Sequence, residues 1–165
     1  MKGEDAVRDR VTSRLCLVVL VVWLLTVSAL AWMFVKGWTT PGSDHRTEII
    51  LAQSERDLIL AEMRMLLKAV HGVITGLSGA GGDMSVAEGA ARAAGMAMAA
   101  DVNPAVMAKL PLAFKQMGMS IHQDMDALAN AIVQKEAPPQ LLQRLSSMTA
   151  RCTTCHDMYR FSVGR

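Results

Sequence analysis

Apolar residues recur at helical spacing along most of the chain beyond residue 45. One apolar stripe advances in steps of three and four residues through Leu60, Met63, Leu67, Val70, Ile74 and Leu77, and a second through Phe114, Met117, Ile121, Met125, Leu128 and Ile132. Such steps place side chains on one face of an α-helix. Glycine and proline interrupt the pattern, so we predict four helices over about residues 46–77, 85–100, 110–135 and 138–160.

Four amphipathic helices joined by short connections predict an all-α fold, an antiparallel four-helix bundle over residues 46–165. Composition agrees, because Met is frequent at 13 residues and aromatic residues make up only 4%, which favours helices over strands. A length of 165 residues allows one modest domain and an appendage. The turn residues of "TTPGSD" predict a polar linker over residues 37–45.

The appendage is a run of 21 uncharged residues, 15–35, "LCLVVLVVWLLTVSALAWMFV". As a helix it is long enough to cross a bilayer core of about 30 Å, so residues 15–36 are predicted to be one transmembrane anchor. Basic residues within residues 1–14 place the N-terminus in the cytoplasm and everything after residue 36 outside it. The alternative is a signal peptide cleaved near Ala31, although the run is longer than a usual signal-peptide core.

The formal charge of +2 is concentrated at the N-terminus. Residues 1–43 carry five Lys or Arg against three Asp or Glu, which leaves twelve of each in the rest of the chain. A neutral body without a basic stripe excludes nucleic acid as an expected partner.

The segment "CTTCH", with Cys152, Cys155 and His156, carries the most specific chemistry. A zinc site would need a fourth ligand, and the remaining cysteine, Cys16, lies in the apolar run. A redox pair would lie at the start of a helix after a strand, whereas this pair lies near the end of the last predicted helix. A structural disulfide of this spacing would close only a tiny loop and add little stability. Cys-x-x-Cys-His instead specifies one covalently attached haem c, with both thiols bound to the ring and the imidazole as an axial iron ligand. Export agrees with haem attachment outside the cytoplasm.

The other side of the iron would face the first predicted helix, because the first and last helices of an antiparallel bundle run side by side. Counting 1.5 Å per residue brings the region from Leu60 to Leu67 to the level of His156. Met63 lies in the middle of the stripe there, whereas Met65 points away, so Met63 is the candidate distal ligand. The alternative is a five-coordinate iron whose distal pocket is lined by Leu60, Met63 and Leu67.

Two other histidines are weaker candidates. His122 lies at the flank of its stripe, and we expect it to form an interhelical hydrogen bond or to lie at the surface. His71 lies about two turns beyond the haem level, at the edge of the bundle.

The ending "CTTCHDMYR" on a bundle from about 46 to 161 resembles the class II c-type cytochromes, the cytochrome c prime and cytochrome c-556 group. The resemblance implies that His156 is the proximal ligand and that Arg160 packs near the proximal haem face. In this family an arginine of the first helix precedes the distal residue by four positions, which matches Arg56 and Leu60. The family also implies a homodimer paired through the first helix. The long apolar N-terminal segment departs from its usual soluble form.

These features predict a membrane-anchored periplasmic monohaem c-type cytochrome that carries single electrons between redox partner proteins. It would lie in the bacterial inner membrane with its haem domain in the periplasm, or be soluble there after cleavage near Ala31. The alternative function is binding of nitric oxide or carbon monoxide at a five-coordinate haem, favoured by an apolar Leu60 over the iron. We do not expect an enzyme, because the distal region offers no His/Arg pair suited to cleaving an O–O bond and Arg64 projects beside the stripe.

Overall fold

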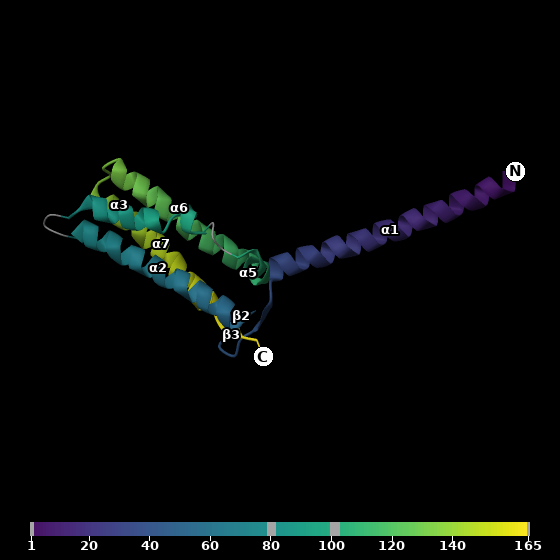
Figure 1. Ribbon diagram of the computed structural model, residues 1–165, viewed down its shortest axis with the longest axis horizontal. Helices are drawn as coiled ribbons and strands as arrows, with labels where there is room; N and C mark the ends of the chain where they lie inside the picture. The colour runs from purple at the N-terminus through teal and green to yellow at the C-terminus, as the bar shows by residue number, and fades with distance from the viewer. Residues whose placement is uncertain (1, 79–81, 100–102, 165) are drawn as a thin grey trace.

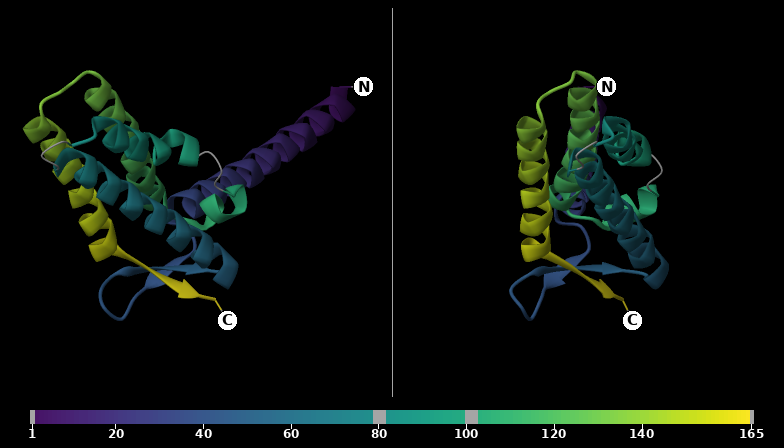
Figure 2. Two further views of the ribbon diagram at one scale, coloured as in Figure 1. Left: turned by 60° about the vertical axis from the view of Figure 1, so that its left-hand side comes forward. Right: turned by 90° about the vertical axis from the view of Figure 1, so that its left-hand side faces the viewer.

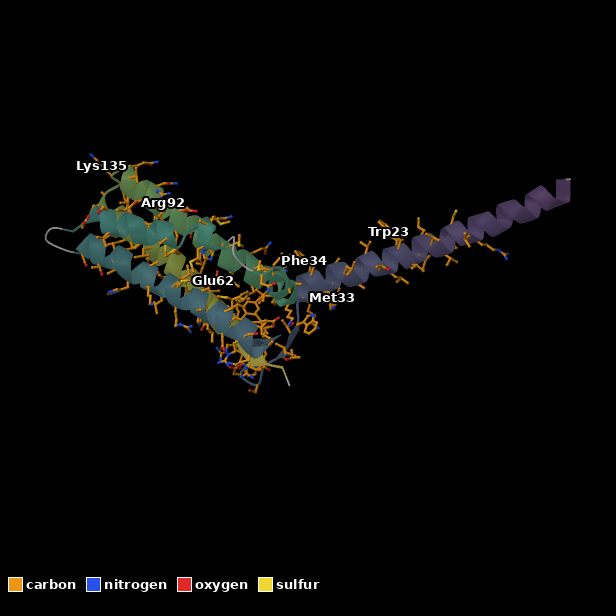
Figure 3. All side chains as sticks on the ribbon, in the orientation of Figure 1. Trp23, Met33, Phe34, Glu62, Arg92 and Lys135 are labelled. Carbon is orange, nitrogen blue, oxygen red and sulfur yellow. The ribbon has the colours of Figure 1, made fainter. Side chains whose placement is uncertain are left out.

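A computed structural model describes residues 2–78, 82–99 and 103–164, with side chains from residue 13 onward (Figure 1). The chain is mostly helical, at 77%. Helix α1 (Lys2–Lys36) projects alone from the remaining elements. Its stretch Ser13–Lys36 is long and apolar enough to cross a membrane, and its side chains lie in the open, as Trp23 shows in Figure 3.

The helices of the domain overlap the four predicted segments, except for a short helix over Pro104–Lys109 that was not predicted. They are α2 (Gln53–Ser78), α3 (Met84–Ala93), α4 (Met96–Ala99), α5 (Pro104–Lys109), α6 (Leu112–Val133) and α7 (Pro138–Met158). Helix α2 packs against α3, α3 against α6, and α6 against α7. The predicted helix 85–100 is divided into α3 and α4, and its last residue lies outside the described part of the chain.

A three-stranded sheet closes one end of the helices, which corrects the all-α prediction (Figure 2). Strands β1 (Thr39–Pro41) and β2 (Thr47–Leu51) are antiparallel, and β3 (Tyr159–Val163) runs parallel to β2. Three predictions were therefore wrong. The predicted linker over 37–45 contains β1, the first helix of the domain begins at Gln53 and not at 46, and the last helix ends at Met158 and not at 160.

The strands form because they complete one another across the length of the chain. Thr47 lies opposite Tyr159 and Leu51 opposite Val163, so each strand supplies the backbone partners that the other needs. The β-branched Ile49 is fully buried and Leu51 nearly so. Helix α2 then begins at Gln53, where the Glu55 carboxylate accepts the Ala52 N–H at 2.8 Å.

Buried apolar side chains form two clusters. The alanine-rich core lies among α2, α3, α6 and α7 and consists of Ala69, Val73, Ala87, Ala91, Ala94, Ile121, Met125, Leu128, Ala129, Ala131, Ile132, Leu141, Leu145 and Met148. The sheet-end core consists of Ile49, Leu51, Ile59, Val106, Leu110 and Phe114. The α6 stripe is confirmed, since all its members except the half-buried Met117 are buried.

The stripe predicted on α2 was partly wrong. Leu67 is 69% exposed and Ile74 is 44% exposed. The buried face of α2 instead includes Ala69, Val73 and Gly76, which meet α3. This face includes the small residues Ala69 and Gly76, which do not stand out in a stripe of large apolar side chains. The hydrophobic pattern therefore did not indicate it.

Candidate cofactor site

A cavity of about 230 Å³ lies at the sheet end of the helices. Its walls are Arg46, Arg56, Leu60, Met63, Phe114, Cys155, His156, Tyr159, Arg160 and Phe161. The cavity thus brings predicted residues of α2 together with the second cysteine and the histidine of the motif, from about 90 residues further along the chain.

The motif occupies the last turns of α7. Cys155 is half-buried against the sheet-end core and His156 is exposed. Cys152, one turn earlier, is half-buried against the alanine-rich core and is not on the cavity wall. Arg46 donates to the His156 carbonyl oxygen at 3.2 Å, so a cation from the β1–β2 hairpin satisfies a carbonyl at the C-terminus of α7.

Both motif thiols are held in the neutral form. Burial raises the pKa of Cys152, and burial together with the nearby Cys152 thiol raises the pKa of Cys155 to about 11. A reactive redox pair needs lowered thiol pKa values and usually lies at a helix N-terminus, whereas this pair lies at a helix C-terminus. The surroundings therefore do not favour a thiol–disulfide oxidoreductase.

The α2 wall of the cavity extends from Arg56 to Met63, about 10 Å along the helix axis. Met63 is half-buried against the sheet-end core, while Met65 is 51% exposed. Leu67 lies beyond the end of this wall and is exposed, so its prediction as a distal-pocket residue was wrong. Two of the three predicted distal residues, Leu60 and Met63, thus lie on the same cavity wall as His156, whereas Leu67 does not.

Arginines supply the charged part of the cavity wall. Arg160 pairs with Glu48 at 3.2 Å and with Asp44 at 3.5 Å, and its Nε is buried without a hydrogen-bond partner in the described structure. Arg46 pairs with Asp44 at 2.6 Å, and this hydrogen-bonded contact lowers the pKa of Asp44 to about 2. Arg56 was matched from the family resemblance, whereas Arg46 was missed because only the hairpin brings it to the cavity.

His122 lies outside the cavity and links helices, one of the two expected roles. It is 2% exposed, with Nδ1 2.8 Å from the Ala94 carbonyl oxygen and Nε2 3.0 Å from a Glu62 carboxylate oxygen. Both partners of His122 are hydrogen-bond acceptors. Only the protonated imidazole carries an N–H on each ring nitrogen, so only this form can donate to both. The hydrogen bond to Glu62 accordingly raises the pKa of His122. His71 is exposed.

The cavity wall combines apolar, cationic and motif side chains. Leu60, Met63, Phe114 and Phe161 offer apolar contacts, the arginines offer cations, and the motif adds a thiol and an imidazole. The enclosed volume is somewhat below the range of about 300–1,000 Å³ of organic-ligand sites, but the mouth is open at the exposed His156. Within the described residues no three His, Cys, Asp or Glu side chains gather to hold a metal by themselves. Comparisons with family models, curated proteins and solved structures found no match to this chain.

Proposed function

We propose that this protein is a membrane-anchored monohaem c-type cytochrome that carries single electrons on the periplasmic side of a bacterial inner membrane. The observation that carries the proposal is the shared cavity of Cys155 and His156 from α7 with Leu60 and Met63 from α2. On this interpretation α2, α3, α6 and α7 are the four helices of a class II cytochrome bundle. The sheet is an addition to that plan.

The residues of the motif and several residues of the cavity wall then have defined roles. Cys155 and His156 on the wall, together with Cys152 one turn earlier on α7, would hold a covalently attached haem c, with His156 as an iron ligand. When bound, the haem iron supplies a centre that gains or loses one electron. Arg46 positions the end of α7 through the His156 carbonyl, and Arg160 offers a cation to an acidic substituent. The apolar residues limit water access, which helps set the reduction potential.

The anchor is the part of α1 over residues 15–36, with residues 1–14 in the cytoplasm. The continuous apolar surface of Ser13–Lys36 supports this assignment, because no other part of the described chain covers it. Cleavage near Ala31 would leave a soluble periplasmic protein with the same domain. The mass of the mature chain distinguishes the two forms.

Gas binding is the second candidate function, and Leu60 on the cavity wall favours it. If the apolar Leu60 rather than the Met63 thioether faces the iron, the distal position is open to carbon monoxide or nitric oxide. If the Met63 sulfur occupies that position, the site is suited to electron transfer and closed to gases.

Covalent haem attachment is the first test. We expect Cys152→Ala and Cys155→Ala each to lose most of the haem signal that remains on the chain in a denaturing gel, because each removes one thioether. Cys16→Ala, in the apolar helix, is the matched control and should retain the full signal. Unchanged haem staining in both motif variants would refute the proposal.

The ferric spectrum tests the distal ligand. A sulfur-to-iron charge-transfer band that disappears in Met63→Ala and persists in Met65→Ala would assign Met63 as the ligand and support electron transfer. Met65 is the matched control because it is on α2 but exposed. A high-spin spectrum with rapid carbon monoxide uptake in the unmodified protein would reject electron transfer by a six-coordinate haem in favour of gas binding.

A further inference from the structure

A polar groove of about 420 Å³ lies between the C-terminal end of α1 and the β1–β2 hairpin. The side chains that give it polar character are Lys36, Thr39, Thr40, His45, Arg46 and Thr47. Figure 2 shows the hairpin next to the end of α1, on the side of the domain that carries the sheet. No motif residue lines this groove, and it shares only Arg46 with the wall of the cofactor cavity.

The position of the groove relative to α1 is set by backbone contacts. Gly37 ends the helix with φ at +64°, and its N–H donates to the Met33 carbonyl at 2.8 Å. A Cβ on Gly37 would lie 2.5 Å from the Lys109 carbonyl oxygen, so only glycine allows this approach. The Trp38 N–H then donates to the same oxygen at 2.7 Å. The domain is therefore fixed to the helix end without a flexible linker.

A second contact holds the last turn of α1. The Lys115 ammonium lies 3.3 Å from the Phe34 carbonyl oxygen and 3.8 Å from the centre of the Phe34 ring. Figure 3 shows Met33 and Phe34 at this junction. The apolar surface of α1 ends at Lys36, so a bilayer around α1 has its headgroups at the level of the groove. This step rests on the membrane anchor of the proposed function.

The groove carries more positive than negative charge on its walls. Lys36 forms no ion pair within the described structure, and its ammonium lies 5.5 Å from the centre of the Trp32 ring. Arg46 is paired with Asp44, which is not on the wall. A phosphodiester accepts hydrogen bonds from ammonium, guanidinium and hydroxyl groups, all of which are present.

We propose that this groove binds the phosphate group of an anionic phospholipid, such as phosphatidylglycerol, from the periplasmic leaflet. Lys36 supplies the main charge, and the hydroxyls of Thr40 and Thr47 supply further donors, whereas the Thr39 hydroxyl already donates to the Lys36 carbonyl oxygen at 3.2 Å. An anionic lipid is favoured over a zwitterionic one because no acidic side chain on the wall would pair with a headgroup ammonium. Arg46 lines both the groove and the cofactor cavity, so the bound headgroup lies next to the haem site.

Native mass spectrometry of the full-length chain, reconstituted in nanodiscs containing equal amounts of phosphatidylglycerol and phosphatidylcholine, tests the proposal. We expect one phosphatidylglycerol to be retained in preference to phosphatidylcholine. Lys36→Gln should weaken this retention about tenfold, the effect of losing one charge-assisted hydrogen bond. Lys68→Gln, an exposed lysine on α2, is the matched control and should behave like the unmodified chain.

Equal retention of both lipids, or equal losses in Lys36→Gln and Lys68→Gln, would overturn the proposal. Displacement of the lipid by millimolar inorganic phosphate, with phosphate itself retained, would assign the groove to free phosphate and also overturn it. If the unmodified chain carries no covalent haem but still retains phosphatidylglycerol, only the cytochrome function is contradicted. A soluble mature chain that begins after Ala31 would contradict the anchor and the lipid site together.

Discussion

The two cores of the domain are built from different side chains, and they hold the helices in different ways. The alanine-rich core brings α2, α3 and α6 close together. A Cβ added at Gly72 would lie 2.7 Å from the Ala90 Cβ, and one at Gly76 would lie 2.7 Å from the Ala87 Cβ. At the sheet end, large residues replace alanine and the helices border a cavity.

Aromatic side chains support the open end. The Phe114 ring meets Tyr159 edge to face at 5.4 Å between ring centres and Phe161 at 5.7 Å. These contacts join α6 to β3, directly after the motif, and the sheet joins β3 to the segment after α1. The comparison indicates that close packing of small residues stabilises the domain, whereas the larger residues and the sheet border an open cavity.

The largest expected difference between the two cores concerns a pair of methionines. Met125 is fully buried in the alanine-rich core, so Met125→Ala should lower the free energy of unfolding by about 2–5 kcal/mol. Met63→Ala should cost about 1 kcal/mol, because Met63 is half-buried and already borders a cavity. Chemical denaturation of the full chain in detergent measures both, in a Cys152→Ala, Cys155→Ala background that excludes covalent haem. Equal costs would contradict the distinction between the two cores.

A pair of glycines gives a smaller effect with opposite signs. Gly76→Ala should destabilise the chain by about 1–3 kcal/mol, because the new methyl group would meet the Ala87 backbone nitrogen at 2.7 Å. Gly118→Ala should stabilise it by about 0.5–1 kcal/mol, because no atom lies within 4 Å and alanine favours the helix. Thermal unfolding of the two variants checks this contrast, and a stabilising Gly76→Ala would show that α2 and α3 are not closely packed.

The smallest expected effect concerns pH and the Glu62–His122 pair. Because the folded state raises the pKa of His122, its protonated form stabilises the fold. That contribution is complete below the unfolded value of about 6.5 and is lost as pH rises through the higher folded value. Stability should therefore decline on the alkaline side of pH 6.5, and His122→Asn should flatten that decline. His71→Asn, at an exposed position, is the control and should leave the slope unchanged.

Periodicity predicted the helical regions well where large apolar residues lie on one face, as in the α6 stripe around Ile121, Met125 and Leu128. It failed on α2, where Ala69 and Gly76 make the contact with α3 and Leu67 is exposed. Small residues give a weak apolar signal, although they permit the closest packing.

Only some of the residues on the cavity wall were among the predicted site residues. Cys155 and His156 were recognisable from their spacing, and Leu60 and Met63 from a count along antiparallel helices. The β2–β3 pair was not predictable in this way, because Thr47 and Tyr159 meet only in the folded chain. The position of Arg46 on the cavity wall was therefore not predicted.

The amino-acid sequence alone determined the helical character, the single long apolar segment and the Cys-x-x-Cys-His spacing, because these depend on residues close together along the chain. The tertiary structure decided which residues share the cavity and that α1 ends directly on the domain. Those outcomes depend on contacts between distant segments, such as Gly37 with Lys109 and β2 with β3. Local sequence patterns do not predict such contacts, because the backbone hydrogen bonds and packing of each segment form only when the distant segment is in place.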